Sequence, residues 1–331
     1  MVNVKRVAMS ISSRMRQLLK VIGIAFGVSV FSANLWAEEG HRFLASDSEK
    51  HIIAIVNAKG EIEWKESVGA LHDLHMLPNG NILYQKDFQH LIEMSPADKK
   101  VVWSYDAAKS NGNEGKPVEV HAFQRLADGN TMIAESGPAR LIEVDKDGKL
   151  VKEIKMKIEH PATHSDTRLV RKLQNGHYLA SHEHDGVVRE YDGDGKVVWE
   201  FPVPPFDKKP AGGHGVEAFG NQTFEPLRLA NGNTLISTGN GHSVLEVTPA
   251  KEIVWKLTQD ELPGIKFAWI TTLQVLPNGN IVIGNCHAGP DNPQMVEITK
   301  DKKVVWTFKD FNNFGNAFTN SEVLDAPGSI R

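Results

Sequence analysis

The five-residue phrase LPNGN at residues 77–81 decides the fold, because it recurs along the chain at a nearly constant spacing. Its variants are LADGN (126–130), LQNGH (173–177), LANGN (229–233), LPNGN (276–280) and a weaker LDAPG that begins at Leu324. The leading leucines are 49, 47, 56, 47 and 48 residues apart. Self-similarity at such a period indicates a repeat architecture.

Each repeat predicts four strands. The Asn-Gly or Asp-Gly pair favours a type I′ hairpin turn, whose two central residues both need positive φ. An alternating run such as NILYQ follows each turn and predicts a strand. A VVW or IVW phrase recurs 26 residues after the turn leucine at Trp103, Trp199 and Trp255, and a further strand such as HLIEM lies between. Four strands in about 48 residues are typical of a propeller blade.

The incomplete first and last repeats predict how the ring closes. The first repeat enters directly at RFLAS and lacks an innermost strand, whereas the last, FTNSEVLD at 318–325, is an innermost strand with nothing after it. We therefore expect residues 38–331 to form an all-β, six-bladed propeller whose C-terminal strand pairs with the first blade. This pairing would remove both exposed strand edges. The repeated tryptophans are expected to pack between blades.

The first 37 residues have the layout of a secretory signal. They carry five basic and no acidic side chains, and residues 21–37 are an apolar run that ends at Ala37 before Glu38 and Glu39. We expect cleavage after Ala37, a periplasmic or secreted protein, and no stable membrane insertion. The alternative is an uncleaved anchor, for which the run has only the minimum length.

Charge and cysteine content narrow the function further. Residues 38–331 hold 32 basic and 41 acidic side chains, a net charge of −9, which argues against nucleic-acid binding. Cys286 is the single cysteine, so no internal disulfide forms.

The alternating LPNGN and VVW phrases over residues 42–331 resemble the bacterial pyrroloquinoline-quinone-like propellers, and among these the arylsulfotransferase-related proteins. Repeat motifs of this kind imply a fold more than a chemistry. Quinone-dependent dehydrogenases of that superfamily have eight blades and an adjacent cysteine pair, so we expect no pyrroloquinoline quinone here. Arylsulfotransferases are six-bladed periplasmic enzymes that use funnel histidines and an arginine. No catalytic residue is assigned from this resemblance.

Strand order predicts where a site would lie. The turn phrases mark one face, so the long connections between blades and the loops between second and third strands share the opposite face, around the mouth of the channel. Loops of this kind carry function. His72, His121 and Arg168 each lie five residues before a turn leucine, which points them towards the axis, and His182 and His242 lie in loops on the same face.

We therefore predict a mouth cluster of His72, His121, Arg168, His182 and His242, and the second choices are His164, His214 and His287. Converging histidines are typical of metal sites and acid–base sites, and arginine suits anions. The alternative is that the histidines are polar plugs bonded to neighbouring backbone. His214 lies in the longest connection, residues 202–224, whose proline and glycine content favours a lid or rim loop.

The sequence is compatible with three functions. The leading one is an enzyme acting on an anionic or aromatic small molecule, with sulfuryl transfer as the favoured reaction. The second is a metal-assisted lyase or hydrolase acting on saccharides, and the third is a non-catalytic propeller for binding or envelope assembly. The expected ligand is a small molecule or saccharide. No cofactor is required, although a divalent metal would suit histidine ligands, and the sequence does not identify a protein partner.

The signal-peptide hypothesis predicts the mature N-terminus. Export should remove residues 1–37 and leave Glu38 as the first residue, because small residues precede the cleavage site. Mass spectrometry of the protein recovered from the producing cells measures this directly. A full-length chain retained in the membrane fraction would instead identify residues 21–37 as an anchor.

Overall fold

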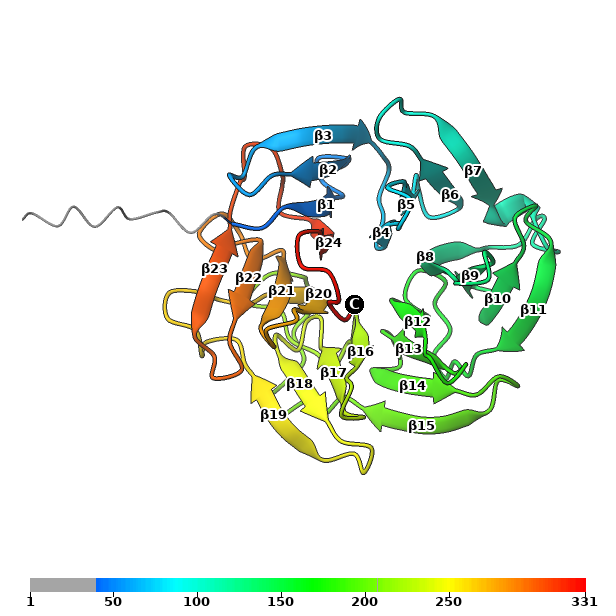
Figure 1. Ribbon diagram of the computed structural model, residues 1–331. Coiled ribbons are helices and arrows are strands. Elements are labelled where there is room, and N and C mark those ends of the chain that lie inside the picture. Colours follow the sequence, from blue (N-terminus) through cyan, green and yellow to red (C-terminus); the bar gives the residue numbers. More distant parts are fainter. Residues whose placement is uncertain (1–39, 207) are drawn as a thin grey trace, which may run out of the picture. The chain divides into compact units, whose positions relative to one another are not determined.

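The computed structural model describes residues 40–206 and 208–331, which form six four-stranded sheets arranged in a ring (Figure 1). The predicted six-bladed, all-β propeller is confirmed. The predicted signal segment, residues 1–37, lies outside the described residues. Within residues 40–206 and 208–331, no helix is both long and apolar enough to span a membrane.

Each blade is an antiparallel sheet whose strands run in order from the ring centre outwards. Blade 1 contains β24 (Phe318–Val323), β1 (Phe43–Asp47), β2 (Ile52–Val56) and β3 (Ile62–Ser67). Blade 2 contains β4 (Leu74–Met76), β5 (Ile82–Gln85), β6 (His90–Met94) and β7 (Val101–Asp106). Blade 3 contains β8 (Glu119–Arg125), β9 (Thr131–Ser136), β10 (Arg140–Val144) and β11 (Leu150–Lys155). Blade 4 contains β12 (Val170–Lys172), β13 (Tyr178–His182), β14 (Val187–Tyr191) and β15 (Val197–Pro202). Blade 5 contains β16 (Pro226–Arg228), β17 (Thr234–Ser237), β18 (Val244–Val247) and β19 (Ile253–Leu257). Blade 6 contains β20 (Trp269–Val275), β21 (Ile281–Cys286), β22 (Met295–Ile298) and β23 (Val304–Phe308). A short 3-10 helix, η2 (Ala107–Lys109), follows β7.

The C-terminal strand closes the ring as predicted. In Figure 1, β24 lies beside β1, and the two strands pair antiparallel with Phe43 opposite Val323 and Ala45 opposite Ser321. Phe318 is fully buried, and its ring centroid lies 5.4 Å from that of Phe314. The closure therefore combines backbone hydrogen bonds with burial of apolar surface between blades 1 and 6.

The hydrophobic core lies between adjacent blades. One cluster, for example, joins Leu91 and Tyr105 of blade 2 to Phe123 and Ile142 of blade 3. The inner strands are buried on both faces, whereas most residues of the outermost strands, such as β7, are exposed or half-buried. Each blade therefore depends on its two neighbours for burial.

The repeated tryptophans connect neighbouring blades, which agrees with the predicted packing role. Their indole Nε1–H groups donate to a backbone carbonyl in the third-to-fourth-strand turn of the next blade. The pairs are Trp103 with Lys146 (3.1 Å), Trp199 with Pro249 (3.1 Å) and Trp255 with Lys300 (2.9 Å). Lys152 holds the corresponding place in blade 3 and lies 5.5 Å from the ring of Tyr178 in blade 4.

The Asn-Gly turns differ from the type I′ prediction, which was wrong. In the first turn Gly80 has a φ of 84°, whereas Asn79 is not among the residues with positive φ. Asn79 instead accepts a hydrogen bond from the Asn81 backbone N–H through its side-chain oxygen, at 3.0 Å. The turn is therefore a type I turn followed by a left-handed glycine, and the asparagine is used for its side chain.

The chain after β24 turns into the centre of the ring, which the sequence did not predict (Figure 1). Ile330 exchanges two backbone hydrogen bonds of 2.9 Å with Val275 at the end of β20. Arg331 contacts the side chains of His75 (2.9 Å), Glu322 (3.1 Å) and Asn320 (2.6 Å). The C-terminal segment thus occupies the centre of the ring on the face of the Asn-Gly turns.

Ring closure predicts a specific truncation effect. Deleting residues 316–331 removes β24, which exposes the edge of β1 and the apolar surface around Phe43. We expect oligomers or aggregates in size-exclusion chromatography with light scattering. Deleting residues 326–331 leaves β24 intact and should preserve the oligomeric state of the full chain. A monomeric 316–331 deletion with an unchanged urea transition would contradict this role for β24.

Candidate functional site

A cavity of about 240 Å³ lies on the face opposite the Asn-Gly turns. Its walls include four histidines, His72, His164, His214 and His287, and three aromatic residues, Phe88, Phe224 and Trp269. Arg168 and Glu183 add a charged pair. We call this space the mouth cavity, since it is formed by the connections and loops that the strand order places there.

The repeat register builds the floor of the mouth cavity. The residues five positions before the six turn leucines are His72, His121, Arg168, Phe224, Thr271 and Thr319. All except His121 line the cavity, and His121 lies fully buried behind His72. One position of the repeat therefore supplies a cavity-lining side chain from five of the six blades, and the residue at that position varies among the blades.

β-Bulges lie at this position in three innermost strands. His121 has no cross-strand partner in β8, because the pairing passes from Val120 to Ala122. The pairing of β20 omits Thr271, and that of β24 omits Thr319. Bulges re-aim side chains and are common beside active sites. Here they occur where the strands reach the cavity.

Three histidines converge on one side of the mouth cavity. His72 Nδ1 lies 2.9 Å from His121 Nδ1, and the His164 ring centroid lies 5.2 Å from that of His121. His164 comes from the connection between β11 and β12. Phe88, from the loop between β5 and β6, packs within 4.9 to 5.2 Å of all three rings. The structure thus brings together His72 and His121 of the predicted mouth cluster and His164, a second-choice residue.

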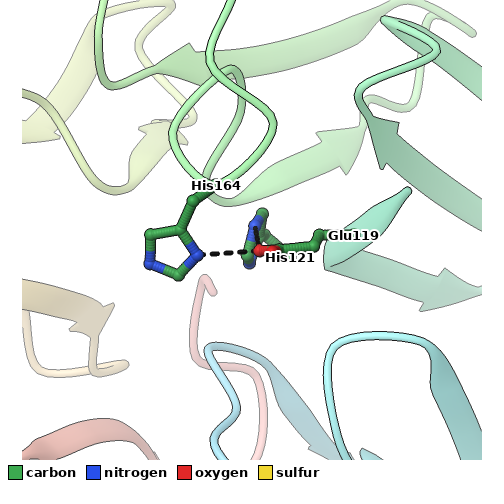
Figure 2. Close-up of side chains that lie close together, drawn as sticks. All are labelled: Glu119, His121 and His164. Carbon is green, nitrogen blue, oxygen red and sulfur yellow. Dashed lines mark hydrogen bonds and ion pairs between the residues drawn. The ribbon is translucent and has the colours of Figure 1, made fainter. Parts of the chain in front are cut away.

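Glu119 joins this group through its carboxylate (Figure 2). Its Oε2 lies 2.7 Å from His164 Nδ1 and 3.1 Å from His121 Nε2. We call Glu119, His121 and His164 the Glu–His–His cluster. Glu119 was not among the predicted site residues, although it precedes His121 by two residues in the same strand, a spacing that places both side chains on one side.

Arg168 is held beside the three histidines by its own ion pair. Its Nε lies 2.5 Å from Glu183 Oε2, and its guanidinium donates a hydrogen bond to the His164 carbonyl. Burial lowers the pKa of Arg168, and the Glu183 carboxylate opposes this effect. The contact with the His164 carbonyl fixes the guanidinium next to the connection that carries His164.

Burial and positive charge keep the inner histidines neutral. Desolvation lowers the pKa of His72 well below 6.5, and the Arg168 charge lowers it further. The pKa of His121 is also lowered by burial and then by Arg168 and His164. Neutral imidazoles can bind metal ions or accept protons.

A second group of side chains forms the opposite wall. The His214 ring lies 4.6 Å from that of Trp269 and 5.0 Å from that of His287. Burial lowers the pKa of His287 to about 4, with a further contribution from His214. His214 is exposed on the predicted rim loop, residues 202–224, so this loop supplies part of the cavity wall.

His182 and His242 do not reach the mouth cavity. His182 is fully buried, with Nδ1 2.9 Å from the Asp166 carbonyl and Nε2 2.8 Å from the Tyr191 hydroxyl. His242 is buried between the carbonyls of Ala268 and Ala218, and its ring therefore anchors the base of the rim loop. Both are bonded to neighbouring groups, as in the alternative that treated histidines as polar plugs.

Below the cavity floor lies a buried charged network that no sequence motif identified. Arg171 makes a two-pronged ion pair with Asp73, at 2.9 and 3.0 Å, and its Nη2 lies 3.8 Å from Glu225. Burial alone would raise the pKa of Asp73, but Arg171 and His75 outweigh it and hold this pKa below its ordinary value. Burial raises the pKa of Glu225 to about 7. These residues fill the ring centre between the mouth cavity and Arg331.

The fold and this polar mouth define a six-bladed propeller with a small-molecule-sized site. The sequence matches, over residues 24–105 and 48–308, the PQQ-like repeat family described as outer membrane protein assembly factor BamB. The chain belongs to this family, which confirms the PQQ-like part of the resemblance. Among curated proteins, none matches the sequence.

Solved structures show the same fold. A protein of unknown function from Bacteroides caccae is similar over 85% of this chain and 98% of its own, with 22% identity and a TM-score of 0.69. A streptogramin B lyase is similar over 83% of this chain and 85% of its own, at 13% identity and a TM-score of 0.53. Virginiamycin B lyase from Staphylococcus aureus, solved with quinupristin, is similar over 85% of this chain and 88% of its own, with 11% identity and a TM-score of 0.53. At these identities the likeness concerns the fold alone.

The pH dependence of stability tests whether His182 is a buried, neutral histidine with a structural role. Its pKa is lowered to about 4, mainly by burial, whereas an ordinary imidazole has a value of 6.5. As the pH falls from 6.5 to 4, the unfolded chain binds a proton that the folded chain does not. His182 should therefore reduce the free energy of unfolding by about 1.4 kcal/mol per pH unit in this window. Urea denaturation should show that the free energy of unfolding of the wild type falls more steeply, as the pH is lowered, than that of His182→Gln. A pH-independent difference would contradict the assignment.

Proposed function

We propose that the protein is an exported enzyme that binds an anionic small molecule with an aromatic or sugar ring in the mouth cavity. The supporting observation is that one cavity is lined by Arg168, His72, three aromatic side chains and His164, through which the Glu–His–His cluster reaches it. A volume of about 240 Å³ suits a small ligand or one end of a larger one. The proposal of export rests on the N-terminal sequence.

Recognition would combine charge with ring stacking. Arg168 cannot lose its charge near neutral pH, so an anionic group is the natural partner for the cavity floor. Phe88, Phe224 and Trp269 offer ring faces around the same space. Aromatic rings and the apolar faces of sugars both pack well on such side chains.

Sulfuryl transfer is the first reaction that this site supports. The Glu119 carboxylate accepts a hydrogen bond from His164 Nδ1–H, which leaves Nε2 of this exposed ring as base or nucleophile. In such a transfer, Nε2 attacks sulfur, the sulfur–oxygen bond to the aryl group breaks, and the aryl oxygen leaves with the electron pair and takes up a proton. A phenolic acceptor would then attack the sulfuryl group on His164 and lose its own proton.

A metal-assisted lyase or hydrolase acting on an acidic saccharide is the second reaction. The observation that favours it is the donor set of the Glu–His–His cluster, two imidazoles and a carboxylate within 4.8 Å of one another. A non-catalytic role in assembly is the remaining alternative, because the matched family is described as an outer membrane protein assembly factor. A purely structural propeller has no need for this polar cavity.

Replacing the charged pair tests the proposed ligand class. The double variant Arg168→Gln, Glu183→Gln removes the cationic group without leaving a buried unpaired carboxylate. We expect it to weaken binding of 4-nitrophenyl sulfate about tenfold or more, measured by calorimetry, and to leave binding of uncharged nitrobenzene unchanged.

The matched control is Arg125→Gln, Glu93→Gln, which removes an ion pair of 2.8 Å between blades 2 and 3. It should leave ligand binding unaltered. If neither aryl sulfates nor acidic saccharides bind to or are converted by the wild type, the proposed function fails.

A further inference from the structure

We infer that Glu119, His121 and His164 form a binding site for one divalent transition-metal ion at the edge of the mouth cavity. The inference rests on the proposed function only in treating this cavity as the place where substrate binds. It deepens that proposal, because a metal-bound His164 would favour the metal-assisted reaction over attack by its nitrogen on sulfur.

The spacing of the donor atoms fits a common ion. Figure 2 shows Glu119 Oε2 between the two rings, 2.7 Å from His164 Nδ1 and 3.1 Å from His121 Nε2. Ligands that share one ion with bonds of about 2.1 Å lie roughly 3 to 3.5 Å apart. His164 has 56% of its side chain exposed, so a small rotation of this ring can bring its nitrogen to that spacing.

The buried ring nitrogen of His121 lacks a hydrogen-bond partner. The ring is fully buried, and Nε2 makes no hydrogen bond among the described residues although Glu119 lies 3.1 Å away. A buried polar atom without a partner costs about 1–3 kcal/mol. A cation bound to the Nε2 lone pair and to the carboxylate would satisfy both groups at once.

The surroundings of His121 resemble the outer shell of a metal site. Histidine ligands usually donate their second ring N–H to a fixed acceptor, which orients the ring. His121 Nδ1 lies 2.9 Å from His72 Nδ1, so His121 can donate there and present the Nε2 lone pair to the ion. The bulge at His121 and the packing of Phe88 hold this arrangement.

The donor set selects the kind of ion. Two imidazoles and one carboxylate suit Zn²⁺ and neighbouring transition metals, whereas Mg²⁺ and Ca²⁺ prefer oxygen ligands. Three protein ligands leave coordination positions open for substrate or water. Because His164 lines the mouth cavity, these positions lie where a substrate held by Arg168 would reach them.

Metal titration tests the site without any assumption about activity. The purified protein, treated with a chelator and dialysed, is titrated with Zn²⁺ by calorimetry and with Co²⁺ by absorbance. We expect one equivalent per chain, a higher midpoint of thermal unfolding, and Co²⁺ absorption bands of a histidine-bound ion. Glu119→Gln, His121→Ala and His164→Ala should each weaken Zn²⁺ binding by about tenfold or more.

His90→Ala is the matched control, because His90 lies beside two carboxylates, Asp87 and Asp106, on the surface. It should leave Zn²⁺ affinity unchanged. Absence of stoichiometric binding, or binding that the three cluster variants do not weaken, would overturn the inference. Ligand binding by metal-free protein that takes up no Zn²⁺ would refute the metal site alone, whereas Zn²⁺ binding without any ligand would refute the proposed function alone.

Discussion

The pairing of β24 with β1 is the interaction on which the rest of the molecule depends. It joins the last strand of the chain to the first blade, and without it the ring would have two open edges. Because the core lies between blades, each blade is buried only when both neighbours are present. Closure therefore completes blade 1 and buries the apolar surface between blades 1 and 6, so that the first and last blades also have two neighbours.

The closed ring also builds the site. Symmetry brings one residue of each repeat to the same height at the mouth, so chemistry is introduced by varying that position, from His72 and His121 to Arg168 and Thr271. The ring centre below is occupied by the Asp73–Arg171 pair and by Arg331, which leaves the mouth as the face where the cavity opens. The rigid repeat fixes the floor, while the connections carrying His164 and His214 supply the walls.

The number of blades and the closure of the ring could be predicted from the sequence, because the spacing of a repeated phrase is visible there. The turn phrases predicted six blades and the closure, and the register predicted that His72, His121 and Arg168 share one height. The turn type was wrong because Asn79 acts through its side chain and only Gly80 adopts positive φ. His182 and His242 were placed at the mouth by loop position, but a loop residue can equally turn inward and bond to backbone. Glu119 was missed because carboxylates are common on strand ends, and the bulge that aims His121 has no sequence signature.

The proposed metal site, the Glu–His–His cluster, lies at the mouth of the propeller beside a cavity of small-molecule size. Anomalous diffraction from a crystal of the Zn²⁺-soaked protein, recorded at the zinc absorption edge, tests it most directly. We expect one strong anomalous peak about 2.0–2.2 Å from Glu119 Oε2, His121 Nε2 and His164 Nδ1. A map whose peaks lie elsewhere, with the three side chains bonded to one another and no ion between them, would contradict it.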